Sequence, residues 1–326
     1  MRIAITGANG HIGCNLARHL RGEGHELRLL VHQRQDAVEA LGAELIRGDV
    51  TDAAAMAGLV RGMDAVVHTA GRISIDGDRD GLLTRVNAAG TRTVVNACLS
   101  EGVGRLVHFS SIHTYDPFPL DEPLDETRPP VSDHASAYDR SKLEADEAVR
   151  DGVARGLSAV LVAPTSVIGP DDHYPSLLGQ AVIDIVRGRM PMLVPGGYDF
   201  VDVRDVCRGV AAALTRGRAG EKYLLAGHYL TIRELAALIG QASGRRAPQT
   251  VLPGWLLQGL VPVFRGVAWV SGKPPLLTRE SLRALVESNP QVSSRKAAEE
   301  LGYTRTPAER TIADTIAWFR QAGRID

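Results

Sequence analysis

Lysine, cysteine and long runs of like charge are scarce in this sequence. Four lysines stand against 33 arginines, and 37 basic residues nearly balance 38 acidic ones. No block of five or six like charges occurs, which argues against a nucleic-acid-binding tail. Cys14, Cys98 and Cys207 are far apart and have neither C-x-x-C nor Cys/His spacing. We therefore predict no disulfide framework, no metal site and no nucleic-acid partner, and a small neutral substrate fits this composition better.

Targeting signals and membrane spans are missing as well. The N-terminal stretch MRIAITGANG runs straight into a strand pattern, without the basic start and apolar run of a secretion signal, so we predict a cytoplasmic protein. Residues 251–272 are apolar, but glycine and proline interrupt them too often for a membrane span. At 326 residues the chain is long enough for one large α/β domain or for a core domain with a smaller one attached.

Strand and helix patterns alternate through the first half of the chain. Short apolar runs suited to buried strands are each followed by a segment with helical spacing. These runs are Ile3–Thr6, Glu26–Val31, Glu44–Arg47, Ala65–His68, Leu106–Ser110 and Ser158–Ala163. The alternation is typical of a parallel sheet covered by helices on both faces, so we predict an α/β fold of the doubly wound Rossmann type.

The pattern changes after Pro170. We expect a helix at Tyr174–Arg187, a short strand and turn in MPMLVPGG at 190–197, a helix at Val203–Thr215 and a strand at Lys222–Leu225. Helical patterns dominate from Thr231 onward. The predicted domains are a dinucleotide-binding domain at 1–169, to which 198–216 returns, and a smaller, mainly helical, substrate-binding cap at 170–326.

A glycine-rich turn follows the first predicted strand. Gly7, Gly10 and Gly13 form G-x-x-G-x-x-G at the opening of a helix. Gly7 permits a tight turn, Gly10 lets the backbone approach a pyrophosphate, and Gly13 allows the helix to pack closely on the strand. The N–H groups at the start of this helix, including those of His11 and Ile12, are available to the phosphates. We predict a bound dinucleotide; the alternative is a glycine-rich turn without a ligand.

The end of the second strand bears on the choice of dinucleotide. A carboxylate there binds the ribose 2′-hydroxyl of NAD, whereas a basic residue suits the 2′-phosphate of NADP. Val31 takes the place of the carboxylate, and His32 and Arg34 follow, so NADP is favoured. NAD stays possible, because Asp36 lies close by and Arg34 also suits a solvated loop.

The third strand ends in the stretch GDVTD. The carboxylate of Asp49 and the side chain of Val50 are placed there to bracket the adenine of a dinucleotide. The alternative for Asp49 is an ordinary turn or N-cap residue.

The stretch SAYDRSK contains the strongest catalytic pattern. Helical spacing through SKLEADEAVRDGVARG places Tyr138 and Lys142 on one helix face, four residues apart. A phenol has an ordinary pKa near ~10, and a neighbouring ammonium group stabilises the phenolate and lowers that value. A surface pair without consequence is the alternative. Upstream, an apolar strand ends in Ser110 and Ser111, where a hydroxyl can bind a substrate oxygen, and the amide of Asn87 can hold a water or the backbone near the lysine.

Together these stretches resemble the extended short-chain dehydrogenase/reductase family, closest to its dihydroflavonol reductases and 3β-hydroxysteroid dehydrogenases. The stretches are TGANGHIG, GDVTD, VVHTAG, VNAAGT, FSSIHTY, YDRSK and PTSVIGP. The resemblance implies that Ser111 binds the reacting oxygen and that Tyr138 acts as acid and base. It implies that Lys142 lowers the tyrosine pKa and binds the nicotinamide ribose, with Asn87 completing the set. It also implies a homodimer and cofactor contacts at Ala70, Gly71, Pro164 and Thr165.

Departures from the family pattern bear on the substrate. Nucleotide-sugar epimerases commonly carry an asparagine and an arginine that hold the diphosphate; this chain has Ser166 and Tyr198 there, and Asp199 adds a negative charge. Residues 251–272 resemble the helical segment of the sterol and flavonol reductases and suit an apolar ligand, although ordinary cap core or a dimer contact would look alike. The polar residues expected around the substrate are Ser111, His113, Tyr115, His134, Ser166, His173, Tyr174 and Tyr198.

The predicted function is an NADP-dependent oxidoreductase that transfers hydride reversibly between the cofactor and a carbonyl or secondary alcohol of a small apolar molecule. The first alternative is an NAD-dependent sugar epimerase or dehydratase, which returns the hydride to its own substrate. The second is a non-catalytic, NADP-sensing binding protein. The presence of both Tyr138 and Lys142 argues against the second alternative.

Overall fold

The computed structural model describes residues 1–74, 77–78, 80–257, 259 and 278–326. A seven-stranded sheet forms its core, with every strand parallel to its neighbours in the order β3-β2-β1-β4-β5-β6-β9. Its strands are β1 (Arg2–Thr6), β2 (Glu26–Val31), β3 (Glu44–Arg47), β4 (Ala65–His68), β5 (Arg105–Phe109), β6 (Ala159–Pro164) and β9 (Lys222–Leu225). The order reverses between β1 and β4, which is where doubly wound sheets bind their ligands.

Helices cover both faces of this sheet because successive strand residues point to opposite sides. Ile3 and Ile5 of β1 pack on the face of α1 (His11–Gly22) and α7 (Val203–Arg216). Ala4 packs on the other face, against α2 (Ala53–Val60) and α4 (Gly90–Ser100) together with α5 (Ala137–Ala154). Short elements complete this domain: η1 (Glu39–Leu41), α3 (Leu82–Thr84), the π-helical η2 (Arg85–Ala89) and η3 (Ile112–Thr114).

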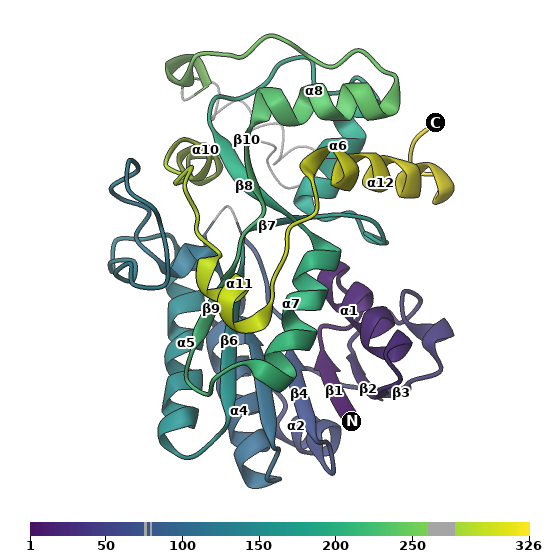
Figure 1. The fold of residues 1–326 in the computed structure, drawn as a ribbon, viewed down its shortest axis with the longest axis vertical. Coiled ribbons are helices and arrows are strands. Elements are labelled where there is room, and N and C mark those ends of the chain that lie inside the picture. Colours follow the sequence, from purple (N-terminus) through teal and green to yellow (C-terminus); the bar gives the residue numbers. More distant parts are fainter. Residues whose placement is uncertain (75–76, 79, 258, 260–277) are drawn as a thin grey trace.

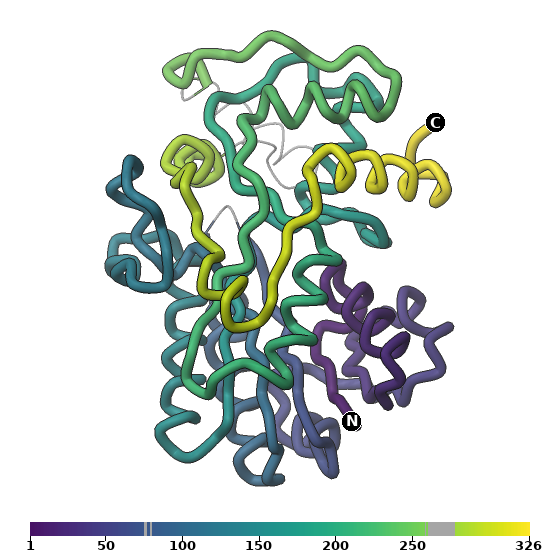
Figure 2. The backbone as a smooth tube through the Cα atoms, in the orientation of Figure 1, coloured from purple at the N-terminus to yellow at the C-terminus, as the bar shows by residue number. Residues whose placement is uncertain are grey.

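A cap lies at the end of the core where the sheet strands finish (Figure 1). Its small sheet has the order β10-β8-β7. The strands are β7 (Ser166–Ile168), β8 (Gly197–Asp202) and β10 (His228–Thr231), and the helices are α6 (Leu177–Val186), α8 (Ile232–Ser243), α10 (Arg279–Val286) and α12 (Ala308–Gln321). Figure 2 traces the chain from α11 (Arg295–Leu301), which packs on the core, back to α12 in the cap.

The predicted α/β fold and its six core strands are confirmed, with strand ends shifted by a residue at most. The helix expected from Tyr174 begins at Leu177, because the Ser176 hydroxyl caps it by accepting from the N–H of Gly179 at 3.0 Å. The strand expected within 190–197 is wrong: Leu193 forms an isolated bridge to Val251, and β8 begins only at Gly197.

The predicted domain division at residue 169 stays a prediction. The core sheet does take in β9, which that division left in the cap, and β7 and β10 were not anticipated. All three cysteines are buried and free, as expected of small apolar residues.

The described residues were expected to contain neither a membrane-spanning helix nor a metal site. No helix in residues 1–74, 77–78, 80–257, 259 and 278–326 combines the length and apolar character needed to cross a bilayer. Within the same ranges, no group of three or more His, Cys, Asp or Glu side chains is placed to share a metal ion. The apolar wall expected at 251–272 falls mainly on positions 258 and 260–277, outside the described residues.

Candidate active site

The glycine-rich turn between β1 and α1 leaves no room for side chains. Gly7 has a φ of +69°, and a Cβ added there would lie 2.7 Å from the backbone nitrogen of Ala70. A Cβ on Gly13 would lie 2.1 Å from the carbonyl oxygen of Gly7. Both glycines are therefore needed to bring the start of α1 against β1 and the loop after β4.

The first turn of α1 suits an anion. Gly10 precedes the helix in extended conformation and caps it with no side chain. The N–H groups of His11, Ile12 and Gly13 open the helix, where an α-helix offers them no internal acceptor. Free donors at the positive end of a helix dipole fit the pyrophosphate of a dinucleotide. The chain therefore fits the cofactor that its sequence predicted.

A charged turn follows β3, next to the end of β2. Oδ1 of Asp49 accepts from the N–H and the hydroxyl of Thr51 at 2.8 and 2.7 Å, and these bonds lower the pKa of the carboxyl group. Its Oδ2 lies 3.7 Å from Nε2 of His32. Val50 is buried, and a Cβ on Gly90 would lie 2.8 Å from its Cγ2. Asp49 is thus a turn residue, and its contact with adenine stays a prediction.

Arg34 lies against the loop that precedes α6. Its guanidinium carbon is 4.4 Å from the ring centroid of Tyr174, whose hydroxyl donates to Asp36. An ion pair between Asp171 and Arg18 of α1 holds the same loop against the core. Tyr174 was expected beside the substrate, but it contacts the two residues predicted to choose the cofactor. The loop returns to α1 before the helix starts, which is why Tyr174 is not among the residues around Tyr138.

Helix α5 presents the predicted catalytic pair. A capping box starts the helix: Oγ of Ser136 accepts from the N–H of Asp139 at 3.1 Å, and Oδ2 of Asp139 accepts from the N–H of Ser136 at 3.3 Å. Tyr138 and Lys142 follow on successive turns of the helix. The tyrosine is partly exposed, whereas the lysine is only 7% exposed.

Three residues predicted for the site gather around the phenol. Ser111 caps η3, and its hydroxyl is within hydrogen-bonding reach of the Tyr138 hydroxyl. The ring of His113 packs edge-on against Tyr138 with 5.7 Å between centroids, and its Nδ1 lies 3.2 Å from Oδ1 of Asp139. Tyr198 packs against the same histidine at 6.3 Å. The phenol is therefore surrounded by a hydroxyl and two aromatic rings.

Burial decides the proton affinity of the phenol. It raises the pKa of Tyr138 to about 12, and the hydrogen bond with Ser111 works in the opposite direction. Lys142 is not among the causes of this shift, so the lowering effect expected of it stays a prediction. The lysine ammonium donates instead to the carbonyl oxygen of Phe109. At neutral pH the phenol carries its proton.

Asn87 connects the loop after β4 to α5. Its Nδ2 donates to the carbonyl oxygen of Arg72 and to Oγ of Ser141, both at 2.9 Å, and its Oδ1 accepts from the N–H of Arg72 at 2.7 Å. The neighbouring N–H of Ala70 donates to Oγ1 of Thr6 at 3.2 Å, and Gly71 lies against the Asn87 amide. Asn87 therefore holds the backbone beside the lysine, one of the two roles predicted for it.

The end of β6 enters a second set of polar contacts. Pro164 is buried, and the hydroxyl of the next residue, Thr165, donates to Oδ1 of Asp199 at 2.6 Å. The N–H of Gly227 donates to the same oxygen at 2.6 Å. Asp199 is buried, which raises its pKa, so the negative charge predicted beside the substrate is held inside the cap instead. Ser166 pairs with Phe200 of β8, and its contact with a substrate stays a prediction.

Three other residues expected around the substrate lie elsewhere. His134 is exposed on the loop before α5. His173 lies 2.9 Å from a guanidinium nitrogen of Arg18 and packs edge-on against Trp318. Tyr115 is buried beneath η3 with the ammonium of Lys222 over its ring. Loop position alone could not separate these residues from His113.

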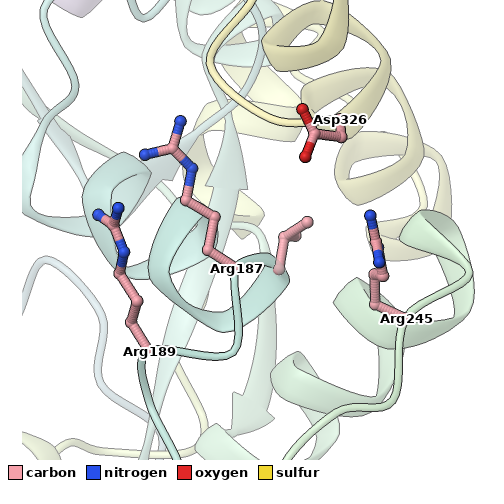
Figure 3. A pocket seen from close by; sticks show the side chains of 5 residues that line it. Arg187, Arg189, Arg245 and Asp326 are labelled. Atoms are coloured by element: carbon pink, nitrogen blue, oxygen red, sulfur yellow. The ribbon is translucent and has the colours of Figure 1, made fainter.

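Two surface hollows lie away from the catalytic pair. One, of about 480 Å³, is lined by Arg187, Arg189, Arg245 and Asp326 at the ends of α6, α8 and the chain (Figure 3). The other is lined by Arg34, Asp36, Tyr174, Pro175 and Arg324, at the adenosine end, the region after β2 where the adenosine of the cofactor is predicted to bind. Neither hollow is lined by Ser111, Tyr138 or Lys142.

Sequence reasoning missed the charged residues behind the pair. Asp146 lies one turn beyond Lys142 on α5 and is fully buried, 2.7 Å from Nζ of Lys222. A signal for Asp146 was present, because spacings of four and eight from Tyr138 share one helix face. No sequence signal linked Lys222 to Asp146, because Lys222 lies on a strand 76 residues further along the chain.

Comparisons with known proteins agree with this geometry. Residues 3–226 match the model of the NAD dependent epimerase/dehydratase family. A sterol demethylase protein B of Methylococcus capsulatus is 32% identical over 332 aligned positions, which cover 100% of both chains. A putative dihydroflavonol 4-reductase of Synechocystis is 29% identical, with 98% of this chain and 95% of the relative covered.

The solved structure named gox2253 superposes with a TM-score of 0.86 at 34% identity, and 99% of each chain is covered. The family match extends over more than half of the chain, and both the fold and the dinucleotide turn are those its sequence predicted. The chain belongs to the NAD dependent epimerase/dehydratase family, within the extended short-chain dehydrogenases/reductases, and is an NAD(P)-dependent enzyme.

Proposed function

We propose that this enzyme is a reductase that transfers hydride reversibly between NADP(H) and the carbonyl or secondary alcohol of a small apolar molecule. The observation that carries the proposal is the aromatic wall beside the catalytic hydroxyl. His113 packs on Tyr138, and Tyr198 packs on His113. An epimerase of this family commonly has an arginine at the position of Tyr198 to hold a diphosphate. An aromatic ring offers apolar contact there and no charge.

The bound nicotinamide supplies or accepts the hydride. In the reductive direction, Ser111 donates a hydrogen bond to the carbonyl oxygen and holds it beside the phenol. Tyr138 then donates its proton to that oxygen as the alcohol forms. The raised pKa of Tyr138 suits this direction, because the phenol carries its proton at neutral pH. In this proposal Lys142 stabilises the developing phenolate with its positive charge and binds a ribose hydroxyl of the cofactor.

The remaining residues position this set. Asn87 binds the backbone of Arg72 and the hydroxyl of Ser141, and so keeps α5 in register with the loop after β4. The Asp139 carboxylate accepts from His113, which orients the imidazole against Tyr138. Hydrogen bonds of this kind fix a side chain within the tolerance that catalysis requires.

The cofactor preference rests on Arg34. Its guanidinium is exposed at the end of β2, stacked on Tyr174, where a 2′-phosphate of NADP would be expected. Asp36 next to it is bonded to the Tyr174 hydroxyl, which occupies an oxygen that would otherwise favour the 2′-hydroxyl of NAD. NADP is therefore the proposed cofactor, with NAD as the alternative.

Two relatives favour an apolar substrate over a nucleotide sugar, although a dTDP-glucose 4,6-dehydratase of Streptomyces antibioticus also aligns over 98% of this chain at 28% identity. One is named for sterol demethylation and the other for dihydroflavonol reduction, and both align over nearly the whole chain. The family name also covers epimerases and dehydratases, so hydride return to the same substrate is the competing reaction.

A cofactor-consumption assay separates these reactions. The purified chain is mixed with NADPH and, in turn, a sterol ketone, a dihydroflavonol and a nucleotide sugar, and the loss of NADPH absorbance is followed. A reductase oxidises NADPH with one of the apolar ketones, one cofactor for each alcohol formed. A sugar epimerase keeps NAD(H) through purification and turns over the nucleotide sugar without added cofactor. Binding of NADPH without turnover of any ketone would support the sensing protein instead.

The predicted homodimer and cytoplasmic location belong to the same proposal. A dimer that pairs α5 between two copies would place the exposed side of this helix, including Glu147, at an interface. Light scattering at micromolar concentration, compared with a Glu147→Arg variant, tests it, because only a dimer through α5 would dissociate.

A further inference from the structure

The face of α5 that carries the catalytic pair continues into the protein. Tyr138, Lys142 and Asp146 are four residues apart and share this face. The tyrosine is at the partly exposed end, Lys142 is 7% exposed, and Asp146 is fully buried. Oδ2 of Asp146 accepts from the hydroxyl of Ser110 at 2.8 Å. A carboxylate with no access to water therefore lies one helical turn behind the lysine.

Lys222 of β9 brings a second positive charge to this carboxylate. Its Nζ lies 2.7 Å from Oδ2 of Asp146, donates to the hydroxyl of Thr114 and sits 4.2 Å from the centroid of the Tyr115 ring. The lysine is 7% exposed. Asp146 is therefore paired directly with Lys222, and Lys142 places a second buried ammonium group one helical turn away.

Two histidines complete the surroundings of Lys142. His108 of β5 has its Nε2 3.7 Å from Oδ1 of Asp146, and its ring centroid is 5.3 Å from that of His68 on β4. Burial is the main cause that lowers the pKa of both histidines, to about 3 for His68. Both are neutral at pH 7. The charged groups that face Lys142 are therefore Asp146 and Lys222, with Tyr138 neutral at the open end.

Charges act strongly on one another in such a dry environment, because no solvent screens them. Asp146 favours the ammonium form of Lys142, and Lys222 disfavours it. Burial, with Lys222 adding to it and Asp146 opposing it, lowers the pKa of Lys142 to about 8. Of the two charges, Asp146 has the larger effect. The lysine thus holds its proton at neutral pH by a narrow margin.

We propose that Asp146 and Lys222 form a buried positioning pair that sets the charge on the catalytic lysine. This inference rests on the proposed role of Lys142 in the reaction. Lys222 keeps Asp146 ionised, and its positive charge partly offsets the effect of Asp146 on the pKa of Lys142. Asp146 in turn keeps Lys142 charged. The pH range in which the ammonium supports the phenol is therefore fixed by two residues that touch neither substrate nor cofactor.

The test is a direct titration of Lys142. The chain has only four lysines, so the full-length protein labelled with carbon-13 at lysine Cε gives a short set of nuclear magnetic resonance signals, and Lys142→Arg assigns one of them. The titration needs neither substrate nor cofactor. Failure of the reductase proposal would leave it unaffected, and failure of the titration would leave the reductase proposal intact.

Opposite shifts are the expected signature. Lys222→Met removes a repulsive charge and raises the pKa of Lys142, and Asp146→Asn removes the stronger attraction and lowers it, each by about one pH unit, tenfold in proton affinity. The double variant removes both charges and also titrates below the wild type. It keeps the test open if Asp146→Asn alone fails to fold, because it does not leave Lys222 as a buried charge without its partner. Glu147→Gln, the same chemical change at the exposed neighbouring position, leaves the titration unchanged.

A purely structural pair would give a different result. Folded Lys222→Met and double variants whose Lys142 titrates as in the wild type would overturn the proposal, and so would shifts in the same direction. In the active enzyme, the decline of kcat/KM at high pH should move with the titration, upward in Lys222→Met and downward in the double variant.

Discussion

Two regions of this molecule combine a basic side chain, a carboxylate and a phenol, and they differ in their contact with solvent. At the adenosine end, Arg34 stacks on Tyr174, which is bonded to the exposed Asp36. Behind the catalytic pair, Lys142, Lys222, Asp146 and Tyr115 are each at most 8% exposed. In the first region water can replace any partner, so the contacts can change. In the second region the groups are shielded from water, so each charged group needs its partner.

The difference has a physical basis in desolvation. A buried charge that loses its partner cannot be solvated by water. Removing one partner therefore lowers the free energy of unfolding by far more than the intact pair contributes to it. An exposed ion pair gains little when it forms and loses little when it breaks. The exposed region around Arg34 is therefore suited to discriminating between ligands. The buried region around Asp146 is suited to keeping its side chains in one protonation state.

The largest expected effect compares the two carboxylates. Asp146→Ala leaves Lys222 buried without its partner and should lower the free energy of unfolding by about 3–5 kcal/mol. Asp36→Ala should leave the free energy of unfolding unchanged, because the carboxylate of Asp36 is at the surface. Urea denaturation of both variants beside the wild type measures the difference. Equal losses in the two variants would remove the distinction between the regions.

The next effect concerns acid stability. His68 and His108 are buried and neutral, so the unfolded chain binds their protons first as the pH falls below about 6.5, and stability is lost from there toward pH 3. Between pH 6.5 and 5 each histidine should cost about 2 kcal/mol. His108→Leu should remove the loss of stability that is due to one histidine. It should break no hydrogen bond, since neither ring nitrogen of His108 has a hydrogen-bond partner among the described residues.

Urea denaturation at pH 7 and pH 5 checks this expectation. His134→Leu, on an exposed loop, is the matched control and should follow the wild type at both values. A His108→Leu variant that loses as much stability as the wild type between the two pH values would contradict it.

A smaller effect is expected at the adenosine end. Arg34→Ala should weaken NADPH binding about tenfold, the loss of one charge-assisted hydrogen bond, and leave NADH binding nearly unchanged. Fluorescence titration with both cofactors measures the ratio. Equal weakening of both cofactors would mean that Arg34 binds something other than the 2′-phosphate.

The smallest effect is expected at the tyrosine that supports this arginine. Tyr174→Phe keeps the ring under Arg34 and removes only the bond to Asp36, so the ratio of NADPH to NADH affinity should change less than about threefold. A change as large as that of Arg34→Ala would place the hydroxyl itself on the cofactor.

Local patterns predicted the parts of the site that local sequence forms. The turn at Gly7 to Gly13 and the pair at Tyr138 and Lys142 each lie within one element, where spacing determines geometry. Tyr174 was placed with the substrate because loop residues carry no signal for the element they pack against. The effect of Lys142 on the pKa of Tyr138 stays a prediction, because sequence shows a neighbouring charge but not the burial that raises the pKa of the phenol.

The contacts of Asp146 were beyond reach for a related reason. Its partner Lys222 comes from β9, a strand that joins the core sheet after the chain has passed through the cap. Only the assembled sheet brings the two together. The same holds for Asp199, whose charge is held by Thr165 and Gly227 from two other elements.

The most direct measurement is the rate of NADPH oxidation by Tyr138→Phe with a ketone that the wild type reduces, together with the affinity for NADPH. We expect a kcat lower by about 10²–10⁴-fold, since the phenol is the proposed proton donor, and an unchanged affinity for NADPH, since the fold and the glycine turn are intact. A variant that reduces the ketone at the wild-type rate would contradict it.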